Sequence, residues 1–412
     1  MISAVAYLDR VNISIAARAI ATSFRLSNVQ LGWIFSSFVL GYAASQAPAG
    51  RIADAIGPRK VLTAAVIWWA VFSAAITLIP QSATNALLLL IAARFSLGIG
   101  EAVVYPASNC IVARWIPTEE RGIANGIIFS GVGFGAGVTP PLITAIMVGH
   151  GWRSAFWCSA AIGLIMGGIW YFIARDSPAE HPLVGSSERA VIERGIPQDS
   201  LSATDRRFSW KEIVTEPNIL AVTLSYFAYG YAAYIFFSWF FIYLSEVRQL
   251  NLRESSYYSM LPFLAMATGS PLGGWISDRL TRRRGPFQGR CGIAAIGMGF
   301  AALFIALGTQ VASARVASVV LAAGAGSLYL SQSSFWSFSA GAGKRSAGAV
   351  SGFMNMGGQI GGALTASTSP FIANHFGWTW SFLVAAVLCA GGAILWLRAA
   401  PEPLLGRKTQ VT

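Results

Sequence analysis

Four charged residues inside apolar segments constrain this chain most. Asp9 and Arg10 lie in the first apolar segment, and Arg94 and Glu101 lie seven residues apart in the fourth. A charge at the centre of a bilayer costs about 2.5–3.5 kcal/mol on insertion scales, so such residues face a bundle interior or a water-filled path and pair with each other. Two acids and two bases in one half of the chain predict anion recognition combined with proton handling.

Long apolar segments recur along the whole chain. Of its 412 residues, 55% are hydrophobic and 11% are charged, whereas a soluble domain carries roughly 25% charged residues. We predict an all-α membrane protein with twelve transmembrane helices, at about 2–21, 31–50, 60–80, 86–112, 121–148, 152–174, 218–245, 256–276, 290–309, 313–340, 346–373 and 376–399. Because Asp9 comes so early, a full first helix would need about ten more residues upstream, which predicts a truncated start.

Basic residues are distributed unevenly between the two sides of the predicted membrane. The formal net charge is +12, and most of the 29 Lys and Arg residues fall in alternate loops. Cytoplasmic loops of membrane proteins carry such an excess. The pattern predicts a multi-pass protein of the cell inner (plasma) membrane with both termini in the cytoplasm. No basic–aromatic interleaving accompanies the charge, so nucleic acid is not an expected partner.

Residues that hold metals or perform covalent catalysis are sparse. The four Cys residues fall far apart in apolar segments, without the spacing of a metal site. The three His residues all lie in predicted loops, which argues against a His-rich metal site or a Ser–His triad. We therefore predict no metal, no cofactor and no enzymatic activity.

One long polar stretch divides the chain. Residues 175–217 are charged and contain Pro, and they predict a cytoplasmic linker, with a short amphipathic helix around 186–195. The linker separates a six-helix bundle at 1–174 from a second at 218–400, and a cytoplasmic tail follows at 401–412. We expect the protein to be a monomer.

The two halves repeat each other. GRIAD at 50–54 matches GWISD at 274–278, and Arg121 matches Arg345, both at an offset of 224 residues; GWRSAF at 151–156 matches GWTWSF at 377–382. Matches in the same order at nearly one offset indicate two six-helix bundles in a parallel repeat. A substrate site at the interface of such bundles, near the middle of the membrane, is a plan typical of transporters.

The segment GRIADAIGPRK (50–60) resembles the signature loop of the major facilitator superfamily, and GGWISDRLTRRRG (273–285) stands where that superfamily repeats it. Asp54 and Asp278 can accept hydrogen bonds from helix N-termini or from Arg, and so hold one conformation closed. The gating residues that we predict in these two loops are Gly50, Asp54, Arg59, Asp278 and Arg279.

A closer resemblance is to the anion:cation symporter family, which includes bacterial galactonate and hexuronate transporters. YLDRVNISIA (7–16), RFSLGIGEAVVYPASN (94–109), GWRSAFW (151–157) and FMNMGGQIGG (353–362) carry it, and it spans most of the chain. The resemblance implies that Asp9 and Glu101 carry protons, that Arg10 binds a substrate carboxylate, and that Arg94 pairs with the acids or contacts substrate. It further implies substrate contacts from Tyr7, Tyr42, Ser333, Trp336 and Asn355.

The residues alone support part of this. Two helical turns place Arg94 and Glu101 on nearly one face, about 10 Å apart, where each can reach a partner on the first helix. Protonation of one acid would release an Arg, which can then bind a carboxylate bidentately. Asn355 and Gln359 share one face of an apolar helix and need polar partners. Gln332 and Tyr229 are weaker candidates for substrate contact.

These observations favour proton-coupled symport of a small organic anion, with a sugar acid such as an aldonate or uronate as the expected substrate. An anion exchanger or uniporter for a small carboxylate or organophosphate is the alternative, and an exchanger predicts a substrate Arg from each half. A transporter-like receptor is a third hypothesis, which predicts an appended signalling domain. The expected partners are the organic anion, protons and the lipid bilayer.

Overall fold

The computed structural model describes residues 1–412 except 27, 197–207, 241–242, 251 and 400–412. The described chain is helical and contains no β-strand in the described ranges. Its α-helices are α1 (Ile2–Phe24), α2 (Asn28–Ile56), α3 (Pro58–Leu78), α4 (Ala86–Glu101), α5 (Val104–Trp115), α6 (Arg121–Ile173), α7 (Ser186–Gly195), α8 (Trp210–Thr215), α9 (Pro217–Ser238), α11 (Leu252–Arg284), α12 (Ile293–Gln310), α13 (Ala314–Gly343), α14 (Ala347–Phe376) and α15 (Trp378–Arg398).

The label α6 covers the fifth and sixth predicted spans, which are two helices separated at Gly151, where φ 78° and ψ 167° favour glycine. The fourth predicted span is divided between α4 and α5, which meet just after Glu101. The break places Glu101 at a helix end in the middle of the span, where its side chain faces the interior.

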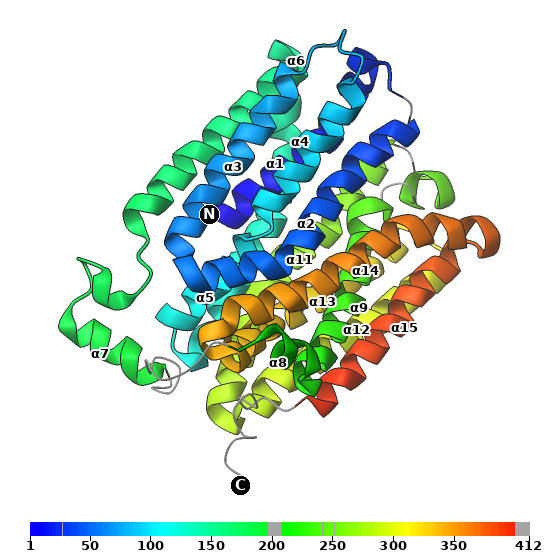
Figure 1. Ribbon diagram of the computed structural model, residues 1–412. Helices are drawn as coiled ribbons and strands as arrows, with labels where there is room; N and C mark the ends of the chain where they lie inside the picture. The colour runs from blue at the N-terminus through cyan, green and yellow to red at the C-terminus, as the bar shows by residue number, and fades with distance from the viewer. Residues whose placement is uncertain (27, 197–207, 241–242, 251, 400–412) are drawn as a thin grey trace.

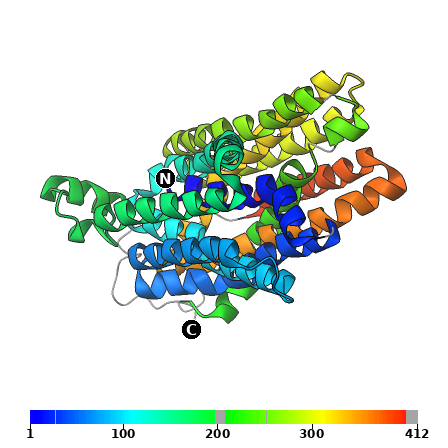
Figure 2. The same ribbon diagram turned by 90° about the horizontal axis from the view of Figure 1, so that it is seen from above.

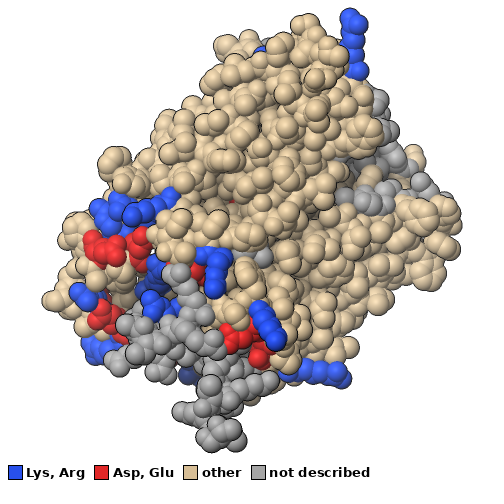
Figure 3. Space-filling view, in the orientation of Figure 1, with Lys and Arg blue, Asp and Glu red and all other residues tan. Residues whose placement is uncertain are grey.

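Apolar surface surrounds the helices. Among the described residues, eight segments are long and apolar enough to cross a membrane, including both parts of α6. Together with α1, α2, α11 and α14, they make the twelve predicted transmembrane helices, six in each half of the chain. Lys, Arg, Asp and Glu side chains gather around the end of the molecule where α7 and α8 lie (Figure 3), which we call the charged end.

The two six-helix bundles meet along two helix pairs. Helix α2 of the first bundle packs against α14 of the second, and α6 packs against α11 (Figures 1 and 2). Glycines bring both pairs together, because a side chain at Gly50 would overlap the carbonyl group of Gly348, and one at Gly274 would overlap that of Gly122. Small residues permit such close approach of membrane helices.

The linker between the bundles is helical in part. Helix α7 forms where the amphipathic helix is predicted and projects from the charged end. Helix α8 begins at a capping box formed by Ser209 and Glu212, and its buried Ile213 packs with Ala349 and Val350 at the start of α14. The linker is therefore fixed to the second bundle beside the α2–α14 contact. The predicted tail at 401–412 lies outside the described residues.

Candidate functional site

Arg10 and Glu101 form a buried ion pair between the first and fourth spans. Nε of Arg10 donates to Oε2 of Glu101 over 2.9 Å, and the Glu101 side chain is fully buried. The pair joins α1 to the helix end that the break after Glu101 creates. Oε1 of Glu101 is buried without a hydrogen-bond partner, so the carboxylate has unused acceptor capacity.

Aromatic rings surround the Arg10 guanidinium. Its central carbon lies 4.2 Å from the ring centroid of Tyr42, 5.0 Å from that of Tyr7 and 5.2 Å from that of Phe38. Cation–π contacts of this kind are worth more when they are desolvated. The rings therefore hold the planar guanidinium in place while Glu101 occupies one of its nitrogens.

Asp9 and Arg94 are less fully paired. Oδ1 of Asp9 accepts a hydrogen bond of 2.6 Å from Ser73 on α3, whereas its Oδ2 has no partner. Arg94 stacks on the Phe38 ring at 4.6 Å, and its Nε and Nη1 atoms are buried without hydrogen bonds. Arg94 still acts on Asp9 electrostatically. Of the predicted set of two acids and two bases, only Arg10 and Glu101 share a hydrogen bond.

A cavity of about 40 Å³ lies between the bundles, next to this set. Tyr7 lies between Arg10 and the cavity, because its ring contacts the guanidinium and also lines the cavity. The remaining polar lining comes from α5, α9, α13 and α14. It consists of Tyr105, Tyr226, Tyr229, Tyr234, Tyr329, Gln332, Asn355 and Gln359.

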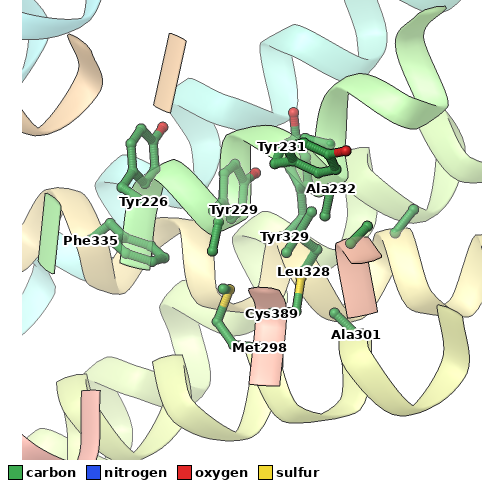
Figure 4. Close-up of a cluster of buried hydrophobic side chains, with 14 of the residues drawn as sticks. Tyr226, Tyr229, Tyr231, Ala232, Met298, Ala301, Leu328, Tyr329, Phe335 and Cys389 are labelled. Atoms are coloured by element: carbon green, nitrogen blue, oxygen red, sulfur yellow. The ribbon is translucent and has the colours of Figure 1, made fainter. Parts of the chain in front are cut away.

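The tyrosines of α9 present an apolar side and a polar side. Tyr226 and Tyr229 stack with their ring centroids 5.0 Å apart, and their hydroxyl groups point away from Met298 and Cys389 (Figure 4). Tyr105 has a buried hydroxyl without a partner, and Oε1 of Gln332 is unpaired as well. Buried polar groups in proteins are normally hydrogen-bonded. These atoms therefore provide unused hydrogen-bonding capacity at the cavity.

The two predicted amides of α14 line the cavity, and each contacts a neighbouring helix. Asn355 Nδ2 donates to Oε1 of Gln46 on α2 over 2.6 Å, and Gln46 Nε2 donates to the carbonyl of Ala102 over 2.7 Å. Gln359 accepts from the hydroxyl of Tyr234 over 2.7 Å. Asn355 thus joins the two bundles directly beside the cavity. Gln46 was not among the residues predicted from sequence.

Two predicted substrate contacts lie elsewhere on α13. Ser333 donates to the backbone carbonyl of Ser270 on α11 over 3.0 Å, and it does not line the cavity in the described structure. Trp336 donates to the hydroxyl of Tyr226 over 3.2 Å and packs behind it, 1% exposed. Trp336 therefore orients a tyrosine that lines the cavity.

The bundles are joined at the charged end by two aspartates. Asp54, at the end of α2, accepts from the backbone amides of Gly348 and Ala349 at the start of α14, each over 2.9 Å. Asp278 accepts from the amides of Gly122 and Ile123 at the start of α6, over 2.9 and 2.6 Å. A helix N-terminus favours an anion. We call these two contacts the latches. Asp54 and Asp278 occupy equivalent positions in the two repeated halves of the chain.

Each of the two aspartates has a further side-chain partner, and the two partners differ. Arg290 bonds Asp278 over 2.6 Å, and the thiol of Cys110 donates to Asp54 over 3.1 Å. The predicted gating residues Arg59 and Arg279 lie outside the latches. Arg59 donates to the carbonyl of Tyr171, and Arg279 stacks on Trp275.

Two asparagines also join the bundles near the latches, and sequence reasoning missed both. Asn109 donates to the hydroxyl of Ser339 over 3.0 Å, and Asn125 donates to that of Ser337 over 3.3 Å. Their signal in the sequence is a lone amide within an apolar span, which must find a polar partner.

We expect Asn355→Leu to destabilise the contact between the two bundles. The change leaves buried Oε1 of Gln46 without its donor, and an unsatisfied buried group costs about 1–3 kcal/mol. Thermal unfolding of the purified protein should begin at a lower temperature. In the double variant with Gln46→Leu, part of the loss should be recovered, and strict additivity of the two changes would contradict the contact.

Comparison with known proteins shows the family and the fold. The family model described as Major Facilitator Superfamily matches residues 1–366 and 343–412. The "Probable sulfoacetate transporter SauU" of Cupriavidus necator is 32% identical over 95% of this chain and 89% of its own length. The "Hexuronate transporter" of Bacillus subtilis is 28% identical over 97% of this chain and 92% of its own length.

A third relative is longer. The "Probable anion transporter 4, chloroplastic" of rice (Oryza sativa subsp. japonica) is 32% identical over 94% of this chain, which spans 65% of that protein's length. Among solved structures, the proton:xylose symporter XylE bound to 6-bromo-6-deoxy-D-glucose superposes with a TM-score of 0.74 at 14% identity, over 98% of this chain and 96% of that one. The chain belongs to the major facilitator superfamily and, within it, to the family of anion transporters that these relatives represent.

Proposed function

We propose that this secondary transporter of anions is a proton-coupled symporter of an organic acid, with sugar acids such as aldonates or uronates as its substrate class. The observation that carries the proposal is the buried Arg10–Glu101 ion pair beside a cavity with unused polar atoms. Solute carriers of this superfamily work by alternating access, in which the two bundles rock about a central site.

Coupling would follow from competition for Arg10. While Glu101 is ionised, its carboxylate occupies Nε of the guanidinium. A proton on Glu101 removes that charge, and a substrate carboxylate can then replace it on Arg10 through two parallel hydrogen bonds. Because each event favours the other, proton and anion bind cooperatively. The aromatic rings around Arg10 keep it oriented during the exchange.

Hydroxyl groups of the substrate would meet the tyrosine side of the cavity. Tyr105 and Gln332 offer a donor and an acceptor that the protein itself leaves unpaired. Tyrosine rings can also pack against the apolar face of a sugar ring. Both features favour a polyhydroxylated acid over a short acid without hydroxyls, and the hexuronate transporter of Bacillus subtilis is a relative with such a substrate.

The conformation would be closed toward the cytoplasm. The excess of basic residues supports a cytoplasmic location for the charged end and for both termini. We place the protein in the inner (plasma) membrane as part of this proposal. Both latches then close the cytoplasmic side. A cavity of about 40 Å³ is far smaller than the roughly 300–1,000 Å³ of typical ligand pockets, so the site must widen to admit substrate.

Exchange of phosphate or organophosphate is less well supported. An exchanger of this kind is expected to have an Arg or Lys from each bundle at its substrate site. The described residues that line the cavity include no Arg or Lys, and the two Arg residues of the buried charged set, Arg10 and Arg94, both belong to the first bundle.

Uptake into proteoliposomes tests the proposal. The purified protein would be supplied with labelled glucuronate, galactonate, sulfoacetate and phosphate, each with and without an inward proton gradient. We expect gradient-driven accumulation of a sugar acid. Equal uptake without the gradient would contradict proton coupling, and preference for sulfoacetate or phosphate would contradict the substrate class.

A further inference from the structure

A second polar cluster lies beside the ion pair, between α1, α3 and the second span of α6. Ser73 donates to Oδ1 of Asp9 over 2.6 Å, and Asn12 Nδ2 donates to Oγ of Ser159 over 2.9 Å. The four residues are at most 3% exposed. Ser73 and Ser159 belong to helices that pack against each other beside α1. We call Asp9, Asn12, Ser73 and Ser159 the oxygen cluster.

Two buried acceptors in the oxygen cluster have no partner. They are Oδ2 of Asp9 and Oδ1 of Asn12. The two residues are three positions apart on α1, so their side chains share a face about 5–6 Å apart at Cβ. Neither acceptor can satisfy the other. A buried carboxylate of this kind needs a proton, a donor or a cation.

We propose that the oxygen cluster binds a sodium ion, in competition with a proton on Asp9. Five side-chain oxygens can contribute, two from Asp9 and one each from Asn12, Ser73 and Ser159. Carboxylate, amide and hydroxyl oxygens are the ligands that hard cations prefer. The cluster holds one carboxylate, and two Arg residues act on Asp9, Arg10 from the same helix and Arg94 from α4. A monovalent ion therefore fits better than a divalent one.

Sodium would serve the same electrostatic purpose as a proton. The four charged residues sum to zero when both acids are ionised, so one bound cation leaves a net charge of +1. An anionic substrate at Arg10 restores neutrality, and each ligand therefore raises the affinity for the other. This physiological role rests on the proposed cation-coupled transport, whereas sodium binding itself does not.

Binding of sodium without substrate tests the inference. Radioactive sodium would be titrated onto the purified full-length protein, and thermal unfolding would be followed in NaCl, KCl and choline chloride at about pH 6 and pH 8.5. We expect saturable binding and stabilisation by sodium alone, weaker at the lower pH. Asp9→Asn should abolish binding, and Ser159→Ala should weaken it at least about tenfold. Ser154→Ala, which removes an exposed hydroxyl from the same helix, should leave it unchanged.

Several outcomes would overturn the sodium site. Equal effects of the three salts would mean that the oxygen cluster holds water or a proton only. If Asp9→Asn still binds sodium, the sodium site lies elsewhere in the protein. If Ser159→Ala does not fold, Asn12→Asp supplies a second carboxylate and should tighten sodium binding at least about tenfold; unchanged affinity would contradict the site. Since no substrate is present, these results are independent of whether proton-driven uptake is observed.

Discussion

Glu101→Gln should abolish gradient-driven accumulation of substrate while substrate exchange continues. Glutamine can still accept from Nε of Arg10, so the local geometry is kept, but it cannot take up a proton. If one proton moves with each monoanion, one pH unit is worth about 1.36 kcal/mol and supports about tenfold accumulation. The ratio of substrate concentration inside to outside should therefore fall from about ten in the wild type to about one in the variant.

Two assays on the same proteoliposomes separate coupling from binding. Net uptake is measured with an inward gradient of about one pH unit, and counterflow is measured with substrate on both sides and no gradient. Glu193→Gln is the control, because Glu193 pairs with Arg189 on the exposed surface of α7. Accumulation by Glu101→Gln at the level of the wild type would move the coupling site away from Glu101. Loss of counterflow as well would indicate a role in substrate binding.

The sequence predicted that acids and bases of the first and fourth spans meet, because few alternatives exist inside a membrane, but it did not specify that Arg10 and Glu101 form the bonded pair. A charge buried there must be paired or face water, and helical periodicity limits which neighbours it can reach. The same reasoning predicted Asp54 and Asp278 at helix N-termini, since two copies of one loop must serve equivalent places in a parallel repeat. Apolar segment lengths predicted the spans, including the boundary at Gly151, but not the break after Glu101 that divides the fourth span into α4 and α5.

The direction of polar side chains within buried helices was not predictable in the same way. Helix α13 carries Ser331, Ser333 and Ser334, but its residues that line the cavity are Tyr329 and Gln332, because the rotation of the helix against α11 decides which side chains face inward. That rotation is set by backbone contacts, such as Gly273 against Leu330, which no pattern in the sequence specifies. As a result Ser333 bonds a backbone carbonyl of α11.

The spacing of the tyrosines on α9 was a sequence signal for the cavity that the prediction did not use. Tyr226, Tyr229 and Tyr234 of α9 recur at intervals that place them near one face, and all three line the cavity. A tyrosine stripe on a membrane helix is compatible with either core packing or a polar site. Only the structure shows that the hydroxyl groups of Tyr226 and Tyr229 point away from Met298 and Cys389 (Figure 4).

Gly50→Val should open the charged end and stop transport. A side chain at Gly50 would overlap the backbone of Gly348, and backbone cannot move aside as a flexible side chain can. Overpacking costs typically 1–3 kcal/mol, and about 1.4 kcal/mol shifts an equilibrium tenfold. Because Gly50 lies between the bundles and not within one, the strain is relieved when α2 separates from α14, which breaks the Asp54 latch.

Cys110 reports on that separation, because its thiol is 2% exposed and bonded to Asp54 when the latch is closed. We expect N-ethylmaleimide to label Cys110 at least about tenfold faster in Gly50→Val, as measured by mass spectrometry of its peptide, with substrate uptake largely lost. Gly391→Val is the matched control, since a side chain there meets open space. Its labelling rate should equal that of the wild type. If Gly50→Val labels slowly yet elutes as a monodisperse protein, the closed latch tolerates the added side chain, and the close approach of α2 to α14 does not control access at this end.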